Sequence, residues 1–467
     1  MTQEEDIFRK LNSNRHRSDA MDMVRRLEAV IEVALLAVVF YIVWRICYGY
    51  DDGPFPAYFG RGKYVLAGVY GVLLWLLCRV MNGFQFGMMK QTDTIFSQII
   101  AVIITNIVEY AILSLIANVM IGALPMVVLT ILDAVFVSLI CTLYQMIYMR
   151  THVPRRLIMI SGGQSAQKLE HKMNARPDKY RIDKEISADV GLDVIRREVG
   201  FYDGAVLGDV PAELRNDILK YCYSLGIRVY AELKISDIIV RGGEIIDIFD
   251  TPLVLVRSRG ITTIERTVKR ALDIICCLAA MVVALPVMGI VAIAIKLDDH
   301  GPVLYRQERV TEGGRKFMIL KFRSMIVDAE RDGEVLPASD HDARITRVGR
   351  VIRAFRLDEL PQFFNILKGD MSIVGPRPER TEHVEKYLAE IPEFIYRYKV
   401  PAGLTGYAQI FGKYNTGAYD KLRLDMMYIE HYSLWLDFKL VLMTIRILFT
   451  KESTEGFEVT DKERQEG

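Results

Sequence analysis

Residues 353–369 read RAFRLDELPQFFNILKG, and the rest of the chain is interpreted outward from this stretch. Pro361 suits only the first turn of a helix and Gly369 suits the end of one, so a short helix is predicted directly after Asp358 and Glu359. The positive end of its dipole favours ionised acids and binds anions. Arginines are dense in the neighbouring sequence: Arg344, Arg347, Arg350, Arg353, Arg356 and Arg377. Two acids among arginines indicate phosphate chemistry, although a capped helix with surface salt bridges explains this stretch alone equally well.

Composition bounds the class of protein. The length of 467 residues allows two or three domains. A hydrophobic share of 51% and a positive mean hydropathy of +0.19 indicate membrane segments. The net charge of +1 argues against a nucleic-acid-binding protein that relies on bulk positive charge. The six cysteines contain no CxxC pair and the seven histidines show no ligand spacing, so neither a zinc site nor a disulfide framework is predicted.

A polar segment and four apolar runs open the chain. Residues 1–26 form a basic, polar N-terminal tail. Four apolar runs follow, at about 30–47, 64–78, 95–119 and 124–148. Four bilayer-spanning helices are the natural count for these runs, although some of them are short. We therefore predict a four-helix transmembrane block over residues 27–150.

Charges around this block predict its orientation. The loop at residues 118–125 contains no lysine or arginine, whereas residues 150–156 are basic, like the N-terminal tail. The positive-inside rule therefore places both ends of the block in the cytoplasm. Glu109 and Asp133 lie within the third and fourth runs, where acids can mark an ion pathway. We interpret them as two acids packed inside the helical bundle.

Residues 151–258 change in character to alternating strands and helices. The segment RRLIMIS at residues 155–161 has the pattern of a buried strand, and a glycine turn and a helical stretch follow it. Such alternation predicts a small α/β, Rossmann-like module with a parallel sheet. Gly162 and Gly163 could approach a phosphate, but the full GxGxxG pattern is absent. A structural or regulatory role is therefore favoured over nucleotide binding.

The apolar run at residues 271–295 is long enough to cross a bilayer, yet Pro286 lies past its middle and should kink the helix. Both flanks are basic: Arg257, Arg259, Arg266, Lys269 and Arg270 precede the run, and Lys296, Arg306, Arg309, Arg315 and Lys316 follow it. One straight crossing would place one basic flank outside the cell. A re-entrant membrane helix over residues 259–296, bent at Pro286, keeps both flanks on one face and is favoured over a fifth span.

Residues 297–450 are predicted to form a mainly α-helical catalytic domain, followed by a charged tail at residues 451–467. Segments 382–398 and 433–449 mix aromatic and basic residues, so they could lie in the headgroup layer, in the domain core, or in both. Lys321 and Arg323 lie in KFRSM, and Arg377 lies between two prolines in GPRPER. Guanidinium forks bind phosphate oxygens through paired hydrogen bonds. Neither a P-loop nor a serine nucleophile elbow is present.

Residues 267–448 resemble a known family, the monotopic phosphoglycosyltransferases, also called polyprenol-phosphate sugar-phosphate transferases, which start bacterial capsule, exopolysaccharide and O-antigen repeat units. Several motifs carry the resemblance: KRALDI, the proline-broken apolar run, GPVLYRQERV, KFRSM, DARITRVGRVIR, LDELPQFFNILKGDMSIVGPRPER and PAGLTGYAQIFG. The four-helix block and the α/β module further resemble the long members of this family. Many members have serine directly before the Leu-Asp-Glu-Leu motif, where this chain has Arg356.

The resemblance implies a reaction and a set of site residues. A UDP-sugar and polyprenyl phosphate would give a polyprenyl-diphosphate sugar and UMP through a covalent phosphosugar-enzyme intermediate. It implies that Asp358 is the nucleophile and a Mg²⁺ ligand, and that Glu359 is its partner, either as a base for the lipid phosphate or as an orienting group. The predicted anion site comprises Lys321, Arg323, Arg353 and Arg377.

The expected location and partners follow from the same resemblance. The chain would lie in the bacterial inner membrane, with its catalytic domain on the cytoplasmic face and its re-entrant helix as the anchor. Its partners would be a UDP-sugar, polyprenyl phosphate and a second copy of the chain in a homodimer, with no nucleic acid. The alternative is a membrane scaffold of a polysaccharide assembly complex that performs no chemistry. A four-helix transporter rests only on Glu109 and Asp133 and is disfavoured.

Overall fold

A computed structural model describes the chain from residue 3 to residue 448, except for 50–54, 56–60, 86–88, 90, 152–153, 164, 249, 259, 328–341, 343 and 413–415. The chain divides into two compact units, residues 1–232 and residues 233–467. The predicted C-terminal tail at residues 451–467 lies outside the described residues. Among the described residues, five helices are long and apolar enough to cross a membrane.

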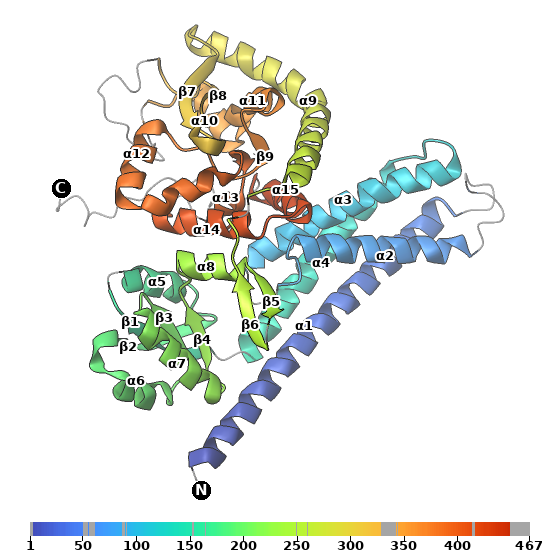
Figure 1. Cartoon of the computed structure of the whole chain (residues 1–467). Helices are drawn as coiled ribbons and strands as arrows, with labels where there is room; N and C mark the ends of the chain where they lie inside the picture. The colour runs from blue at the N-terminus through green and yellow to red at the C-terminus, as the bar shows by residue number, and fades with distance from the viewer. Residues whose placement is uncertain are drawn as a thin grey trace. The chain divides into compact units, whose positions relative to one another are not determined.

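Four of these five helices form a bundle in the first unit (Figure 1). They are α1 (Gln3–Cys47), α2 (Gly62–Val80), α3 (Gln91–Ala117) and α4 (Leu124–Thr151). Each helix packs against its neighbours in the order of the chain, and α4 returns to α1, so the bundle is closed. The four predicted helices are therefore present. Helix α1 begins well before its apolar run, because the polar residues ahead of the run include many good helix formers.

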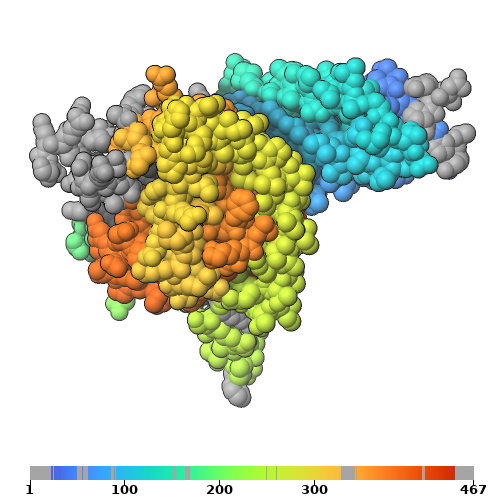
Figure 2. All heavy atoms as spheres, turned by 90° about the horizontal axis from the view of Figure 1, so that it is seen from above, coloured from blue at the N-terminus to red at the C-terminus, as the bar shows by residue number. Residues whose placement is uncertain are grey.

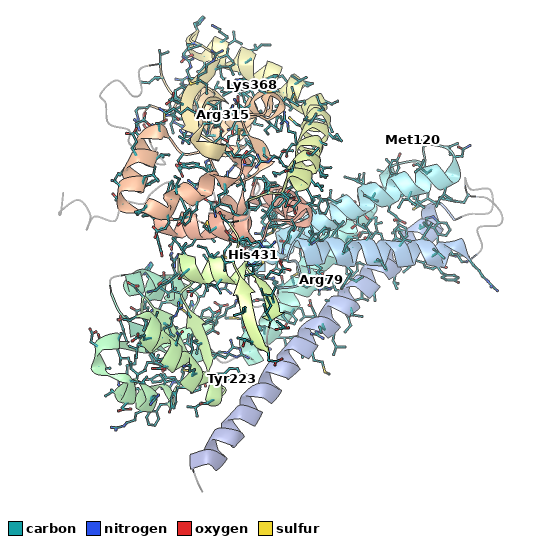
Figure 3. The ribbon with its side chains drawn as sticks, viewed as in Figure 1. Arg79, Met120, Tyr223, Arg315, Lys368 and His431 are labelled. Atoms are coloured by element: carbon teal, nitrogen blue, oxygen red, sulfur yellow. The ribbon has the colours of Figure 1, made fainter. Side chains whose placement is uncertain are left out.

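The interior of the bundle contains polar side chains, whereas its outer face is apolar. Glu109 and Asp133 are fully buried, which confirms that the two acids pack inside the bundle. Asp133 accepts hydrogen bonds from the Tyr70 hydroxyl at 2.8 Å and from the Asn106 amide at 3.3 Å. Met120, in the connection between α3 and α4, is 81% exposed (Figure 3). Leucines, valines and isoleucines on the outside of α1–α4 are exposed in the same way, as expected for a surface that faces lipid.

The α/β module of the first unit has the parallel sheet that the sequence predicted. Its strands are β1 (Arg155–Ser161), β2 (Tyr180–Ser187), β3 (Gly204–Gly208) and β4 (Arg228–Ala231), paired in the order β2-β1-β3-β4. The connections are α5 (Ser165–Asn174), η1 (Ala188–Val190), α6 (Leu192–Val199) and α7 (Ala212–Ser224). A Cβ at Gly162 would lie 2.2 Å from the Asp209 carbonyl oxygen. Close backbone packing thus accounts for Gly162 without any ligand.

The second unit is mainly helical and contains short two-stranded sheets (Figure 1). Its helices after α8 (Ile235–Arg241) are α9 (Thr263–Asp299), α10 (Arg347–Ala354), α11 (Gln362–Lys368), α12 (Thr381–Glu390), α13 (Tyr407–Phe411), α14 (Ala418–Glu430) and α15 (Leu434–Leu448), with the 3-10 turns η2 (Glu312–Gly314), η3 (Leu357–Glu359) and η4 (Pro392–Lys399). Its strand pairs are β5 (Glu244–Ile248) with β6 (Thr251–Leu255), β7 (Leu304–Val310) with β8 (Lys316–Phe322), and β9 (Ser372–Val374) with β10 (Gly403–Thr405).

Helix α8 belongs to the second unit, although its residues lie within the range predicted for the α/β module. Ile235 and Ile238 enter the same core as Leu422 and Met426 of α14. Helix α15 contributes Leu440 to this core and exposes Trp435, so one face of segment 433–449 packs in the domain. The sheet of the module, by contrast, already ends at β4.

Helix α9 lies along the second unit with one face buried. Its 37 residues include Pro286 and form a bent helix (Figure 1). The buried face runs from Lys269 near the start of the helix to Ile295 near its end, while the opposite face is apolar and exposed. Figure 2 shows the yellow-green atoms of this helix as a continuous ridge beside the orange part of the second unit. One face of the helix therefore packs against the second unit, and the other face exposes apolar side chains.

Candidate active site

The predicted short helix is present as α11. Pro361 takes the position just before Gln362, and Gly369 ends the helix with a φ of 90°, a conformation that favours glycine. Asp358 and Glu359 lie in η3 directly before it, as predicted. Arg356 precedes this turn in the left-handed conformation, with a φ of 54°, and its side chain does not cap the turn. Arg356 therefore joins α10 to the turn through a left-handed backbone conformation and not through a side-chain cap.

Glu359 is held by two basic side chains from distant parts of the second unit. Its carboxylate accepts a hydrogen bond at 2.7 Å from Arg377, in the turn after β9, and one at 3.3 Å from Lys321 on β8. Burial by itself would raise the pKa of Glu359, but the charges of Arg377 and Lys321 overcome it and hold that pKa well below its usual range. Glu359 is therefore a fixed anion at neutral pH.

Asp358 has the opposite environment. Its half-buried carboxylate makes no hydrogen bond or ion pair within the described part of the chain. Burial and the negative charge of Glu359 raise the pKa of Asp358, whereas Lys321, Arg353 and Arg377 act against that rise. Adjacent acids whose environments shift their pKa values in opposite directions are typical of groups with separate roles. Asp358 is the accessible, unengaged oxygen donor of the pair.

The structure brings three of the four predicted basic residues to the acids. Lys321 and Arg377 contact Glu359, and Arg353 of α10 acts electrostatically on Asp358. Arg323 is not brought to them: it is 6% exposed and is paired with Asp299 at the end of α9. Residues two apart in a strand point to the same face, so the sequence spacing predicts that Lys321 and Arg323 lie together. Arg323, however, follows the last residue of β8 and pairs with Asp299, which the spacing does not reveal.

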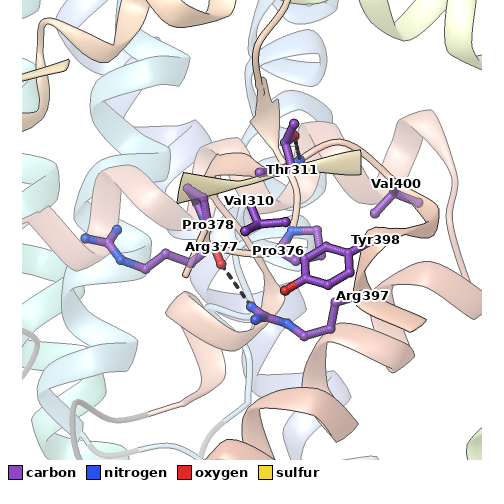
Figure 4. A pocket seen from close by; sticks show the side chains of 9 residues that line it. Val310, Thr311, Pro376, Arg377, Pro378, Arg397, Tyr398 and Val400 are labelled. Atoms are coloured by element: carbon purple, nitrogen blue, oxygen red, sulfur yellow. Dashed lines mark hydrogen bonds between the residues drawn. The ribbon is translucent and has the colours of Figure 1, made fainter. Parts of the chain in front are cut away.

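The turn that carries Arg377 is fixed by groups that sequence reasoning missed. A Cβ at Gly403 would lie 2.0 Å from the Gly375 amide nitrogen, so β9 and β10 can approach this closely only with glycine. Arg397 donates a hydrogen bond at 2.9 Å to the Arg377 carbonyl oxygen, and Figure 4 shows this contact beside a small recess lined by Pro376, Pro378 and Tyr398. Only the two prolines around Arg377 indicated a rigid turn in the sequence.

Beside the site, the end of α11 is tied to the β7–β8 hairpin by charges. Arg315 and Lys368, both labelled in Figure 3, pair with Asp370 at 3.2 Å each. Asn365 of α11 accepts a hydrogen bond at 2.9 Å from the Leu320 amide of β8. These contacts keep the acid-bearing turn at the start of α11 next to the strand that carries Lys321.

The carboxylates of the site decide whether the Mg²⁺ ion expected from the sequence could bind there. Within the described residues, no group of three or more acids, histidines or cysteines could hold a metal ion. Mg²⁺ commonly takes one or two carboxylates and completes its octahedron with water and substrate phosphates. The unengaged carboxylate of Asp358 fits such a site, because nothing in the described chain competes for its oxygens.

Comparison with known proteins gives the family. Residues 264–451 match the model of the bacterial sugar transferase family. A UDP-glucose:undecaprenyl-phosphate glucose-1-phosphate transferase of Caulobacter vibrioides is 46% identical over 193 residues, which are 40% of this chain and 71% of that protein. This chain belongs to the bacterial sugar transferase family.

The Caulobacter protein is named for glucose, whereas two further relatives are named for N-acetylgalactosamine. A UDP-N-acetylgalactosamine-undecaprenyl-phosphate N-acetylgalactosaminephosphotransferase of Aeromonas hydrophila is 41% identical over 259 residues, 53% of this chain and 60% of that protein. A protein of Bacillus subtilis named as a putative undecaprenyl-phosphate N-acetylgalactosaminyl 1-phosphate transferase is 50% identical over 130 residues, 28% of this chain and 72% of that protein. The Aeromonas alignment thus spans less than two thirds of that relative.

The family segment contains the whole predicted site. It begins within α9 and extends beyond α15, so the acid pair, the basic residues around it and the proline of α9 all lie inside. The four-helix bundle and the α/β module precede it. The resemblance stated from the motifs is therefore confirmed for the second unit.

Proposed function

We propose that this protein moves a sugar 1-phosphate from a UDP-sugar to polyprenyl phosphate and releases UMP. The single observation that carries the proposal is the unlike pair in η3, in which Glu359 is locked to Arg377 and Lys321 while the adjacent Asp358 is unengaged. The names of the relatives give the same class of reaction for those proteins.

The proposed first step is attack by an Asp358 carboxylate oxygen on the sugar-bearing phosphorus. That bond forms as the bond from phosphorus to the bridging oxygen breaks, and UMP leaves with the oxygen and its electron pair. In the second step an oxygen of the lipid phosphate attacks the same phosphorus and releases the carboxylate. Arg377, Lys321 and Arg353 would stabilise the negative charge in both steps.

Two assignments within this mechanism follow from the environments of the acids. A carboxylate with a strongly lowered pKa is a poor base, so Glu359 suits the orienting role better than the role of base for the lipid phosphate. Asp358 would also hold Mg²⁺ through its carboxylate. When bound, that ion would neutralise charge on the transferring phosphoryl group.

The test uses the full chain in nanodiscs that contain polyprenyl phosphate and a panel of UDP-sugars. Wild-type protein is expected to release UMP with one or more of them, and Asp358→Asn is expected to abolish release. Glu385→Gln is the matched control, because Glu385 is an exposed acid on α12 and is not among the main charges that act on Asp358 and Glu359. Normal turnover by Asp358→Asn would reject Asp358 as the nucleophile. Absence of turnover with every UDP-sugar would favour the scaffold alternative.

We further propose that α9 re-enters the inner membrane from the cytoplasmic face and keeps the catalytic unit there. The supporting observation is its buried face, since Cys277 packs with Ile366 and Ile295 packs with Phe322 and Ile352. Both halves of the helix thus contact the same unit. A straight crossing of about 55 Å would carry these partners through the bilayer.

Single cysteines test this topology in a variant whose native cysteines are replaced by serine. Thr263→Cys and Leu297→Cys mark the two ends of α9, and both positions are exposed. A membrane-impermeant maleimide is expected to label both in inverted vesicles and neither in right-side-out vesicles. Labelling from opposite sides would establish an ordinary span. The homodimer that the resemblance implies is tested separately by mass photometry of the nanodisc particles, where two copies per particle are expected.

A further inference from the structure

Arg397 is a buried charged residue that the proposed mechanism does not use. It lies in η4, is 3% exposed, and spreads its guanidinium over three acceptors. The Nε group donates to Asp425 of α14 at 2.7 Å, and Nη2 donates to the Arg377 carbonyl oxygen at 2.9 Å (Figure 4). Glu379 lies 4.0 Å from Nη1. A buried charge is costly unless it is paired and hydrogen-bonded, and Asp425 provides both an opposite charge and a hydrogen-bond acceptor for this arginine.

In the turn of residues 376–378, Arg397 is the group that holds the Arg377 carbonyl, while other groups hold the carbonyls on either side. Proline lacks an amide hydrogen, so Pro376 and Pro378 cannot donate to hold the turn. Before Arg377, the Gly403 amide donates to the Pro376 carbonyl at 2.9 Å; after it, Arg309 donates to the Pro378 carbonyl at 3.2 Å. Arg397 supplies the bond between these two. The peptide that carries the Arg377 side chain is thus anchored at its own carbonyl.

The anchor is itself rigid, which makes it suitable for positioning. Asp425 is 1% exposed on α14, and the Arg397 guanidinium also stacks 4.7 Å from the centre of the Phe394 ring. A continuous chain of contacts therefore runs from Asp425 through Arg397 and the backbone of Arg377 to Glu359. Movement of Arg397 would turn the peptide from which the Arg377 side chain projects.

We propose that Arg397 is a positioning residue that acts through the Arg377 carbonyl to aim the Arg377 guanidinium at Glu359 and at the phosphoryl group beside Asp358. This inference rests on the proposed function for its catalytic consequence. The direction in which the Arg377 side chain points does not depend on that function. It predicts that Arg397 matters only as long as Arg377 is present.

The first test is Arg397→Lys in the full chain. Lysine keeps the positive charge opposite Asp425, but its single ammonium group lacks the planar fork that serves several acceptors at once. We expect kcat for UMP release to fall about 100-fold, as for a misplacement of about 1 Å. Retained folding is checked by thermal unfolding. An unchanged kcat in this variant would contradict the proposed role.

The deciding test is a double-mutant cycle with Arg377→Ala. If Arg397 acts through Arg377, then adding Arg397→Lys to Arg377→Ala should lower kcat less than twofold further. An undiminished loss of about 100-fold in the double variant would show a general structural effect and overturn the inference. Arg423→Lys is the matched control, because Arg423 on α14 likewise donates to an acid, Asp420, and to a backbone carbonyl, that of Leu233. It is expected to keep kcat within twofold of the wild-type value.

The same cycle is measured in parallel on equilibrium binding of UDP, which separates this inference from the proposed function. If the wild type binds UDP but transfers no sugar phosphate, the proposed function fails, and the binding cycle still decides the role of Arg397. Additive losses of binding would overturn it. Should Arg397→Lys fail to fold, Asp425→Asn replaces it, since asparagine keeps an oxygen acceptor for Nε. That variant must show the same dependence on Arg377 for the inference to stand.

Discussion

Asp358→Asn is expected to abolish turnover without loss of stability, whereas Glu359→Gln is expected to lower stability. The contrast follows from the contacts of the two acids. Asp358 loses no hydrogen bond on replacement within the described part of the chain, and its ionisation is opposed by burial and by Glu359. Neutral asparagine removes that opposition, so we expect a free energy of unfolding unchanged or raised by up to about 1 kcal/mol at pH 7.

Glu359 gives the other half of the comparison. Its side chain is 14% exposed and accepts charge-assisted hydrogen bonds from Arg377 and Lys321. Hydrogen bonds to charged groups contribute about 1.5–3 kcal/mol, and glutamine keeps one oxygen acceptor but no charge, so a loss of about 1–2 kcal/mol is expected. Thermal unfolding of the full chain in nanodiscs measures this as a fall in Tm of about 2–8 °C.

The pH dependence of the two variants should have opposite signs. The pKa of Glu359 is lower in the folded state than in the unfolded state, where it is about 4.3, so its ionisation stabilises the fold above that pH. This stabilisation is lost as the pH falls through the pKa of the folded state. The stability that Glu359→Gln loses at pH 7 should therefore become smaller in acid. The pKa of Asp358 is higher in the folded state than in the unfolded state, where it is about 3.9, so its ionisation lowers stability only above that pH. Any stability that Asp358→Asn gains at pH 7 should therefore disappear in acid. A fall in Tm for Asp358→Asn equal to that for Glu359→Gln at pH 7 would refute the reasoning.

Three further predictions concern the ion and the framework of the second unit. Removal of divalent cations with EDTA is expected to stop UMP release from wild-type protein, and Mg²⁺ should restore it; full activity in EDTA would exclude the metal. Lys269→Met should lower the free energy of unfolding by about 3 kcal/mol, because the partly buried Asp437 loses the cation that pairs with it at 2.5 Å and keeps the hydrogen bond from Tyr428; unchanged chemical denaturation would contradict this. Gly403→Ala should reduce folded yield, since its Cβ would overlap the Gly375 amide nitrogen; normal expression with normal Tm would contradict the packing.

The sequence determined the features that depend on local chemistry. Proline and glycine fixed where α11 begins and ends, because their allowed backbone angles and missing groups permit few other positions. Apolar runs predicted α1–α4 and the long helix α9, because a bilayer needs about 20 apolar residues per crossing. The alternation of buried strands and helices predicted the parallel sheet, and the adjacent acids and dense motifs indicated the family.

Only the tertiary structure decided how the two acids differ and which cations they meet. Successive residues of a 3-10 turn point about 120° apart, so neighbours in sequence can enter different environments. Glu359 meets Lys321 and Arg377 because β8 and the turn after β9 pack beside η3, and such distant contacts depend on the shapes of whole cores. The same packing sent Arg323 to Asp299 and tied Arg397 to the Arg377 carbonyl, which no local pattern encodes.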